Sequence, residues 1–191
     1  MGEEETIIEE WERVKVPAPP ELTEVEPKIR ETALLILDVQ NQNCNQDRRP
    51  RCVGTLHKIQ MLLEKARKRG MLVIFSLTSA ASKVDMRREV LPRRDEMIIK
   101  AGVDKFYESN LEETLIENGI KAVIIVGTSA HGAVLHTATG AAARKIISIV
   151  PVDGISSTYP YEEQYTAWHL MNAPGTRKRV ILTKADMIQF I

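Results

Sequence analysis

The sequence has no net charge of either sign, because its 26 lysines and arginines are balanced by 26 aspartates and glutamates. A long-range positive field, which binding to nucleic-acid phosphates or anionic lipid exploits, is therefore missing. Apolar runs of the roughly 20 residues that a membrane span needs are missing too. Acidic Glu3, Glu4 and Glu5 stand where a signal peptide carries positive charge. We expect a cytoplasmic protein with no nucleic-acid or membrane partner.

Cysteine is scarce, since Cys44 and Cys52 are the only two among 191 residues. Two cysteines are too few for a disulfide framework, and the four histidines form no zinc-finger spacing. We expect no structural metal and no cofactor. Three interpretations of the cysteines stay open: inert buried thiols, a disulfide that closes the short loop between them, and a reactive thiol at Cys44. A cytosolic setting argues against the disulfide unless the source is hyperthermophilic.

The chain divides into an N-terminal extension, residues 1–31, and a single domain, residues 32–191. The extension is acidic and contains a proline cluster at 17–20, with Trp11 as one of its few apolar side chains. Proline donates no backbone hydrogen bond, so the segment is predicted to lie extended over the domain or over a neighbouring subunit, with Trp11 as its anchor. A disordered tail is the alternative.

The domain alternates short apolar runs with helical patterns. Runs of this kind are typical of strands that are buried on both faces of a parallel sheet. We expect strands at residues 33–39, 71–77, 97–99, 122–126, 146–152 and 180–182. The pattern predicts an α/β protein with three αβα layers around a six-stranded, mostly parallel, doubly wound sheet.

Ligands bind such sheets at the carboxyl ends of the strands, and Asp38 ends the first apolar run. Burying a carboxylate costs several kcal/mol unless a cation or several donors hold it. Lys100 also follows an apolar strand, so we predict a buried Asp38–Lys100 pair. The alternative is that Asp38 caps a loop and Lys100 lies in solvent.

Three separate motifs carry a resemblance. They are LLILDVQNQ at residues 34–42, Lys100 followed by Phe106 and Ser-Asn-Leu at 109–111, and GTSAHGAVLHTA at 127–138. Together they resemble the isochorismatase-like cysteine hydrolases, which include nicotinamidases, carbamoylsarcosine amidase and isochorismatase. The resemblance runs from about Thr32 to the C-terminus.

The resemblance implies a catalytic group at Asp38, Lys100 and position 133. Asp38 would accept and donate a proton, and Lys100 would stabilise its charge. Backbone N–H groups that follow a cis peptide between Thr128 and Ser129 would form the oxyanion hole. Alanine occupies position 133, where the family has its nucleophilic cysteine. The implied pocket adds Gln40, Cys44, Phe106, Ala130, His131 and Gly132.

Ala133 excludes ordinary amidase chemistry, because a methyl group cannot attack a carbonyl. The branch that cleaves isochorismate hydrolyses a vinyl ether, in which protonation by the aspartate carries the chemistry. Ala133 is natural with the chemistry moved or lost, or an engineered change, or it is compensated by another nucleophile. The candidates for that nucleophile are Cys44, Ser79, Ser129 and His131. Whether the chain is an enzyme stays uncertain, with a hydrolase of a small molecule favoured over an inactive ligand-binding or assembly protein.

Two further segments bear on ligands and assembly. Arg48, Arg49 and Arg51 follow Asp38 closely, so they either bind a small anion or form a solvated loop paired with the acidic extension. The aromatic side chains gathered at residues 159–169 indicate an interface, a pocket wall or a core face. With the extension, they predict a homo-oligomer. Nicotinamidases bind a metal through residues after the second strand, and residues 76–90 contain no histidine here, so we expect no such metal.

Overall fold

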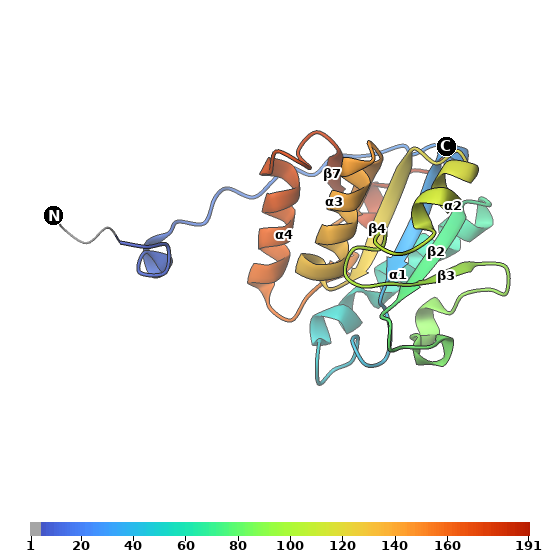
Figure 1. Cartoon of the computed structure of the whole chain (residues 1–191), viewed down its shortest axis with the longest axis horizontal. Helices are drawn as coiled ribbons and strands as arrows, with labels where there is room; N and C mark the ends of the chain where they lie inside the picture. Colours follow the sequence, from blue (N-terminus) through green and yellow to red (C-terminus); the bar gives the residue numbers. More distant parts are fainter. Residues whose placement is uncertain (1–4) are drawn as a thin grey trace.

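A computed structural model describes residues 5–191. Six strands follow the order β3-β2-β1-β4-β5-β7, and the short β6 pairs with β4 as a seventh (Figure 1). All pairings between these strands are parallel. The strands are β1 Thr32–Leu37, β2 Leu72–Leu77, β3 Met97–Lys100, β4 Ala122–Thr128, β5 Ile147–Pro151, β6 Ile155–Ser156 and β7 Val180–Thr183. The predicted α/β class is confirmed.

Helices cover both faces of the sheet. They are α1 Pro50–Lys68, α2 Leu111–Glu117, α3 Leu135–Ala143 and α4 Pro160–Asn172. In Figure 1, α2, α3 and α4 lie in front of the sheet and α1 lies behind it. Apolar side chains of α2, α3 and α4 share one core cluster, and those of α1 belong to a second cluster. The sheet is therefore the middle of three layers.

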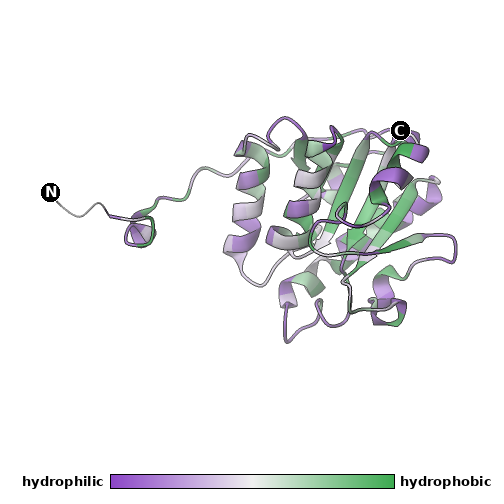
Figure 2. Ribbon diagram, viewed as in Figure 1, coloured by the Kyte–Doolittle hydropathy of each residue, from purple (hydrophilic) through white to green (hydrophobic). Residues whose placement is uncertain are grey.

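Strand β1 explains why a parallel sheet has an apolar run in place of an alternating pattern. All six of its residues are buried. Ala33, Leu35 and Leu37 pack into the cluster under α3, whereas Leu34 and Ile36 pack into the cluster over α1. Both faces of the strand are thus core, and Figure 2 shows the strands as the most hydrophobic part of the fold.

The N-terminal extension has two parts. Near the domain, the Thr23 N–H donates to the Leu182 carbonyl at 2.9 Å, and Val25 forms a parallel bridge with Ile188. Before Pro20 the chain leads away from the domain (Figure 1), with Trp11 58% exposed. No helix within residues 5–191 has the length and apolar character needed to cross a membrane.

Gly127, near the end of β4, lets that strand approach β1 closely. Its φ is +122°, which side chains rarely adopt, and an added Cβ would lie 2.1 Å from the Leu37 carbonyl oxygen. Leu37 immediately precedes Asp38 and pairs in register with Gly127. A side chain at position 127 would therefore push the functional end of β1 away from β4.

We predict that Gly127→Ala lowers the free energy of unfolding by more than about 4 kcal/mol, because backbone overlap adds to an unfavourable φ. Gly119→Ala is the matched control, since Gly119 also has a positive φ but no atom within 4 Å of an added Cβ. It should lose only about 1–2 kcal/mol. Urea denaturation measures both variants, and equal losses would show that the contact with Leu37 has no energetic weight.

Candidate active site

Asp38 begins the site at the carboxyl end of β1. Its φ is +52°, in the left-handed region that aspartate tolerates better than most residues. The Asp38 N–H donates to the Ser76 carbonyl at 3.2 Å, and the Asp38 carbonyl accepts from the Gln40 N–H at 2.9 Å. The side chain leaves the sheet edge in a fixed direction and is buried, with 5% of the residue exposed.

The carboxylate of Asp38 is paired with Lys105. Lys105 Nζ lies 2.8 Å from Asp38 Oδ2, and the Ser76 hydroxyl donates to Asp38 Oδ1 at 2.7 Å. The lysine is 1% exposed and also donates to the carbonyls of Gly102 at 2.7 Å and Ala101 at 3.4 Å. All three ammonium protons thus have an acceptor, as a buried cation requires.

The predicted Asp38–Lys100 pair is wrong. Strand residues point alternately to the two faces of a sheet, and Ile99 occupies the core at the end of β3. Lys100 lies on the opposite face from Ile99, and at the end of this edge strand it is exposed. The chain then turns back over the strand ends, and this loop brings Lys105 to Asp38. Alternation along β3 does not reveal this exposure, because Ile98, on the same face as Lys100, packs against the cluster over α1, and no sequence signal singled out Lys105.

Helix α3 holds the lysine loop in place. The Thr137 hydroxyl accepts the Lys105 N–H at 3.2 Å and donates to the Val103 carbonyl at 3.4 Å. One turn later, an added Cβ at Gly140 would lie 2.7 Å from Asp104 and 2.9 Å from Phe106. Thr137, part of the third sequence motif, therefore positions the cation of the site.

The position at which the resemblance places a nucleophile lies in the turn after β4. A π-helical turn at Ala130–Val134 follows a cis peptide between Thr128 and Ser129, where the resemblance places one. Ala133 is 3% exposed and belongs to the same apolar cluster as Leu37 and Phe106. Position 133 therefore offers a methyl group and no nucleophile at the carboxyl end of the sheet.

A hydrogen-bonded network that the sequence did not indicate supports this turn. The buried Ser157 hydroxyl accepts the Ala130 N–H at 3.0 Å and lies 3.0 Å from Nδ1 of His131. His131 Nε2 lies 3.7 Å from Glu162, and the Ser157 N–H donates to Glu163 at 2.9 Å. Ser157 is fully buried, so it is placed to hold the turn and not to attack a ligand.

Gln40 lies in the turn after β1 and is also engaged. Its side-chain amide donates to the Thr78 hydroxyl at 2.9 Å and accepts the Thr78 N–H at 3.2 Å. This pair of bonds joins the loops that follow β1 and β2. Gln40 thus holds the turn that follows Asp38 against the loop after β2.

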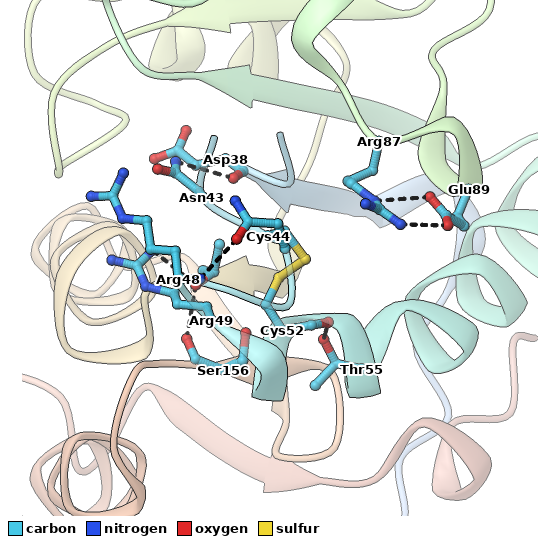
Figure 3. The surroundings of a disulfide bond; sticks show 12 residues. Asp38, Asn43, Cys44, Arg48, Arg49, Cys52, Thr55, Arg87, Glu89 and Ser156 are labelled. Carbon is cyan, nitrogen blue, oxygen red and sulfur yellow. Dashed lines mark hydrogen bonds and ion pairs between the residues drawn. A yellow bond between two sulfur atoms is a disulfide. The ribbon is translucent and has the colours of Figure 1, made fainter. Parts of the chain in front are cut away.

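Cys44 and Cys52 form a disulfide, with Cα atoms 5.2 Å apart (Figure 3). Both are fully buried, and residues 5–191 contain no free thiol. Of the three interpretations, the disulfide holds, so Cys44 is not a substitute nucleophile. The bridge closes a loop that runs from the turn after Asp38 to the first turn of α1. Figure 3 shows Arg48 and Arg49 on this loop, near Asp38.

The three arginines of this region differ. Arg51 forms a two-pronged ion pair with Glu163 of α4, which raises the pKa of its guanidinium. Arg48 is exposed and donates to the Gln42 carbonyl at 3.2 Å. Arg49 is half-buried and donates to the hydroxyls of Thr158 at 3.4 Å and Thr128 at 3.3 Å. Burial, and then the charge of Arg48, lowers the pKa of Arg49.

None of these arginines pairs with the acidic extension within residues 5–191; the acidic partner of Arg51 comes from α4. The same part of the chain contains no group of three or more histidine, cysteine or acidic side chains that could hold a metal ion.

Comparison with known proteins identifies the family to which this fold belongs. The parallel sheet, with a buried carboxylate at its carboxyl edge and a cis peptide opposite, defines a three-layer α/β protein whose site lies at the strand ends. Residues 32–184 match the family model described as Isochorismatase domain. The chain therefore belongs to the isochorismatase family. A search of curated proteins finds no match.

Solved structures show the same fold at low sequence identity. An isochorismatase-like hydrolase from Alkaliphilus metalliredigens is 22% identical, with a TM-score of 0.74 over 82% of this chain and 95% of that one. N-carbamoylsarcosine amidase from Thermoplasma acidophilum is 20% identical, with 0.70 over 82% and 97%. The nicotinamidase of Staphylococcus aureus is 20% identical, with 0.68 over 81% and 99%.

We predict that Lys105→Met lowers the free energy of unfolding by about 3–5 kcal/mol, because it leaves the charge of Asp38 buried without a partner. Lys100→Met should change it by no more than about 0.5 kcal/mol. In the double variant Asp38→Asn/Lys105→Met, the loss should be smaller than the sum of the two single losses. Urea denaturation measures the wild type, the two lysine variants, the single variant Asp38→Asn and the double variant. Similar losses for the two lysines would contradict the assignment of Lys105.

Proposed function

We propose that the chain is a hydrolase of the isochorismatase family that acts on a small molecule without a covalent thiol intermediate. The observation that carries the proposal is the buried Asp38–Lys105 pair. A buried ion pair often contributes no net stability, so its presence at the ligand-binding edge calls for another reason. Proton transfer at Asp38 supplies that reason.

The chemistry needs only a group that accepts and returns a proton. Each oxygen of the Asp38 carboxylate already accepts one hydrogen bond and retains a second lone pair for a ligand or water. On an enol ether, Asp38 in its acid form donates a proton to the terminal alkene carbon, and water adds to the oxocarbenium ion that results and returns a proton to Asp38. The hemiketal then collapses to a carbonyl compound and an alcohol. The oxygen of the added water stays on the product, and Ala133 takes no part.

A non-catalytic binding protein is the second candidate, and Ala133 is the observation that favours it. A cysteine at this position would supply the family's nucleophile, and no other thiol is free within residues 5–191. On this alternative, Asp38 and Lys105 orient a ligand that is released unchanged. Turnover separates the two candidates.

We predict that the wild-type protein hydrolyses at least one member of a panel of enol ethers and leaves the matching amides intact. An amide needs a strong nucleophile at its carbonyl carbon before the C–N bond can break, whereas protonation makes an enol ether electrophilic enough for water to add. Asp38→Asn should lower the rate by about a hundredfold or more, since it removes the proton carrier. Product release followed by mass spectrometry makes the measurement.

Ala133→Cys serves as the control for the site itself. Lys105 and the adjacent backbone N–H groups should favour the thiolate, so the new thiol is expected to react with iodoacetamide faster than free cysteine does. A fast thiol in a protein that turns over no enol ether would overturn the hydrolase proposal in favour of ligand binding. Activity that survives in Asp38→Asn would overturn the assigned role of Asp38.

We further propose a homo-oligomer in which the arm of one copy, residues 5–20, covers α4 of another. Ile7, Ile8 and Trp11 are exposed on the arm, and Trp11 contacts Tyr161 of α4 with ring centroids 6.2 Å apart. Tyr161 continues an exposed aromatic row on α4 that includes Trp168. A second copy offers the arm more apolar surface to bury than its own domain does.

Deleting residues 1–20 is predicted to lower the assembly state, because it removes the apolar arm but keeps the segment that bonds to the domain at Thr23 and Val25. Light scattering at micromolar concentration measures the mass of both proteins. A monomeric full-length protein would end the proposal, and an unchanged oligomer after deletion would remove the arm from it.

A further inference from the structure

Arg49 is a half-buried cation without an anionic partner. Within residues 5–191, no carboxylate lies within 4 Å of its guanidinium, and its acceptors are the hydroxyls of Thr128 and Thr158, at 3.3 and 3.4 Å. Those two bonds use two of the five N–H donors of the guanidinium. Partial burial of a charge that only long bonds to neutral groups compensate is unfavourable unless another group completes the site.

The carboxylates around Arg49 are committed elsewhere. Asp38 accepts from Lys105 and Ser76. Glu162 accepts the backbone N–H groups of Thr158 and Tyr159 at 2.9 and 3.0 Å, where it caps the start of α4. No nearby acid is therefore free to turn to Arg49 without losing bonds that it already makes.

The location of Arg49 ties it to the candidate active site. Thr128, which it contacts, is the first residue of the cis peptide that opens the turn to Ala133. The negative charge of Asp38 is near enough to act on the guanidinium. The backbone of Arg49 is also restrained, because it precedes Pro50 at the start of α1 and lies within the loop closed by the Cys44–Cys52 bridge. A rigid loop presents the guanidinium at little entropic cost.

We propose that Arg49 binds a carboxylate group on the small-molecule ligand of this site. The planar guanidinium matches a carboxylate through two parallel N–H···O bonds, and three of its donors have no acceptor in the described chain. A singly charged group fits better than a phosphate dianion, because Asp38 and Glu162 already place negative charge near Arg49. Arg48 and Arg51 take no part, since one faces solvent and the other is paired with Glu163.

This inference deepens the proposed function by naming the substrate class, and it can be tested without turnover. The probes are two pairs of matched compounds, acetate with acetamide and benzoate with benzamide, together with inorganic phosphate. Each pair differs only in the charged group, and neither carboxylate can be hydrolysed. Calorimetric titration of the full chain gives the dissociation constants.

We predict that at least one carboxylate binds more tightly than its amide. Arg49→Gln should weaken that carboxylate by about tenfold or more, the worth of a charge-assisted hydrogen bond, and leave the amide unchanged. Arg49→Lys should lose part of the affinity, because it keeps the charge but not the fork. Arg48→Gln is the matched control from the same loop and should bind as the wild type does. Thermal melting of each variant verifies that it is folded.

Three results would overturn the inference: no preference of the wild type for a carboxylate over its amide, equal affinities in wild type and Arg49→Gln, or tighter binding of phosphate than of both carboxylates. Failure of the hydrolase proposal looks different. A protein that binds carboxylates through Arg49 but hydrolyses nothing would refute catalysis and leave this subsite in place.

Discussion

The buried pair of Asp38 and Lys105 is the interaction on which the rest of the site depends. Neither charge could leave water alone, and each is stabilised only while the other stays within hydrogen-bond reach. The main-chain carbonyls of Ala101 and Gly102 and the Ser76 hydroxyl complete the bonding of the two groups. The loops after β1 and β3 and the end of β2 must therefore keep their places together, since a shift of one would leave a charge in apolar surroundings.

Much of the fold serves to keep those loops together. Gly127 allows β4 to press against the end of β1, and Thr137 fastens the lysine loop to α3. Ser157 holds the turn that presents Ala133. Alanine occupies the position at which the resemblance places a nucleophile, yet the turn around it is held by hydrogen bonds. These contacts fix the geometry around Asp38 that the proposed hydrolysis requires.

Apolar patterning was enough to predict the sheet and Asp38 at its edge, because a strand buried on both faces has few alternatives. The choice between Lys100 and Lys105 was not accessible in that way, since a loop path decides which lysine returns to the carboxylate. Ser157 escaped notice for the same reason. The cysteine pairing stayed open because a short spacing permits a bridge without requiring one, and the expected cytoplasmic location argued against it.

The distance along the chain between the two charges has a consequence for how the protein folds. Asp38 and Lys105 are 67 residues apart, and Thr137, which fixes the lysine loop, comes 32 residues later. Contacts of such wide separation close late, because the intervening chain must first lose its freedom. Until α3 has docked, the carboxylate at the end of β1 must stay hydrated, so the strand cannot be fully buried earlier. Assembly of the site is thereby coupled to the docking of α3 on the sheet.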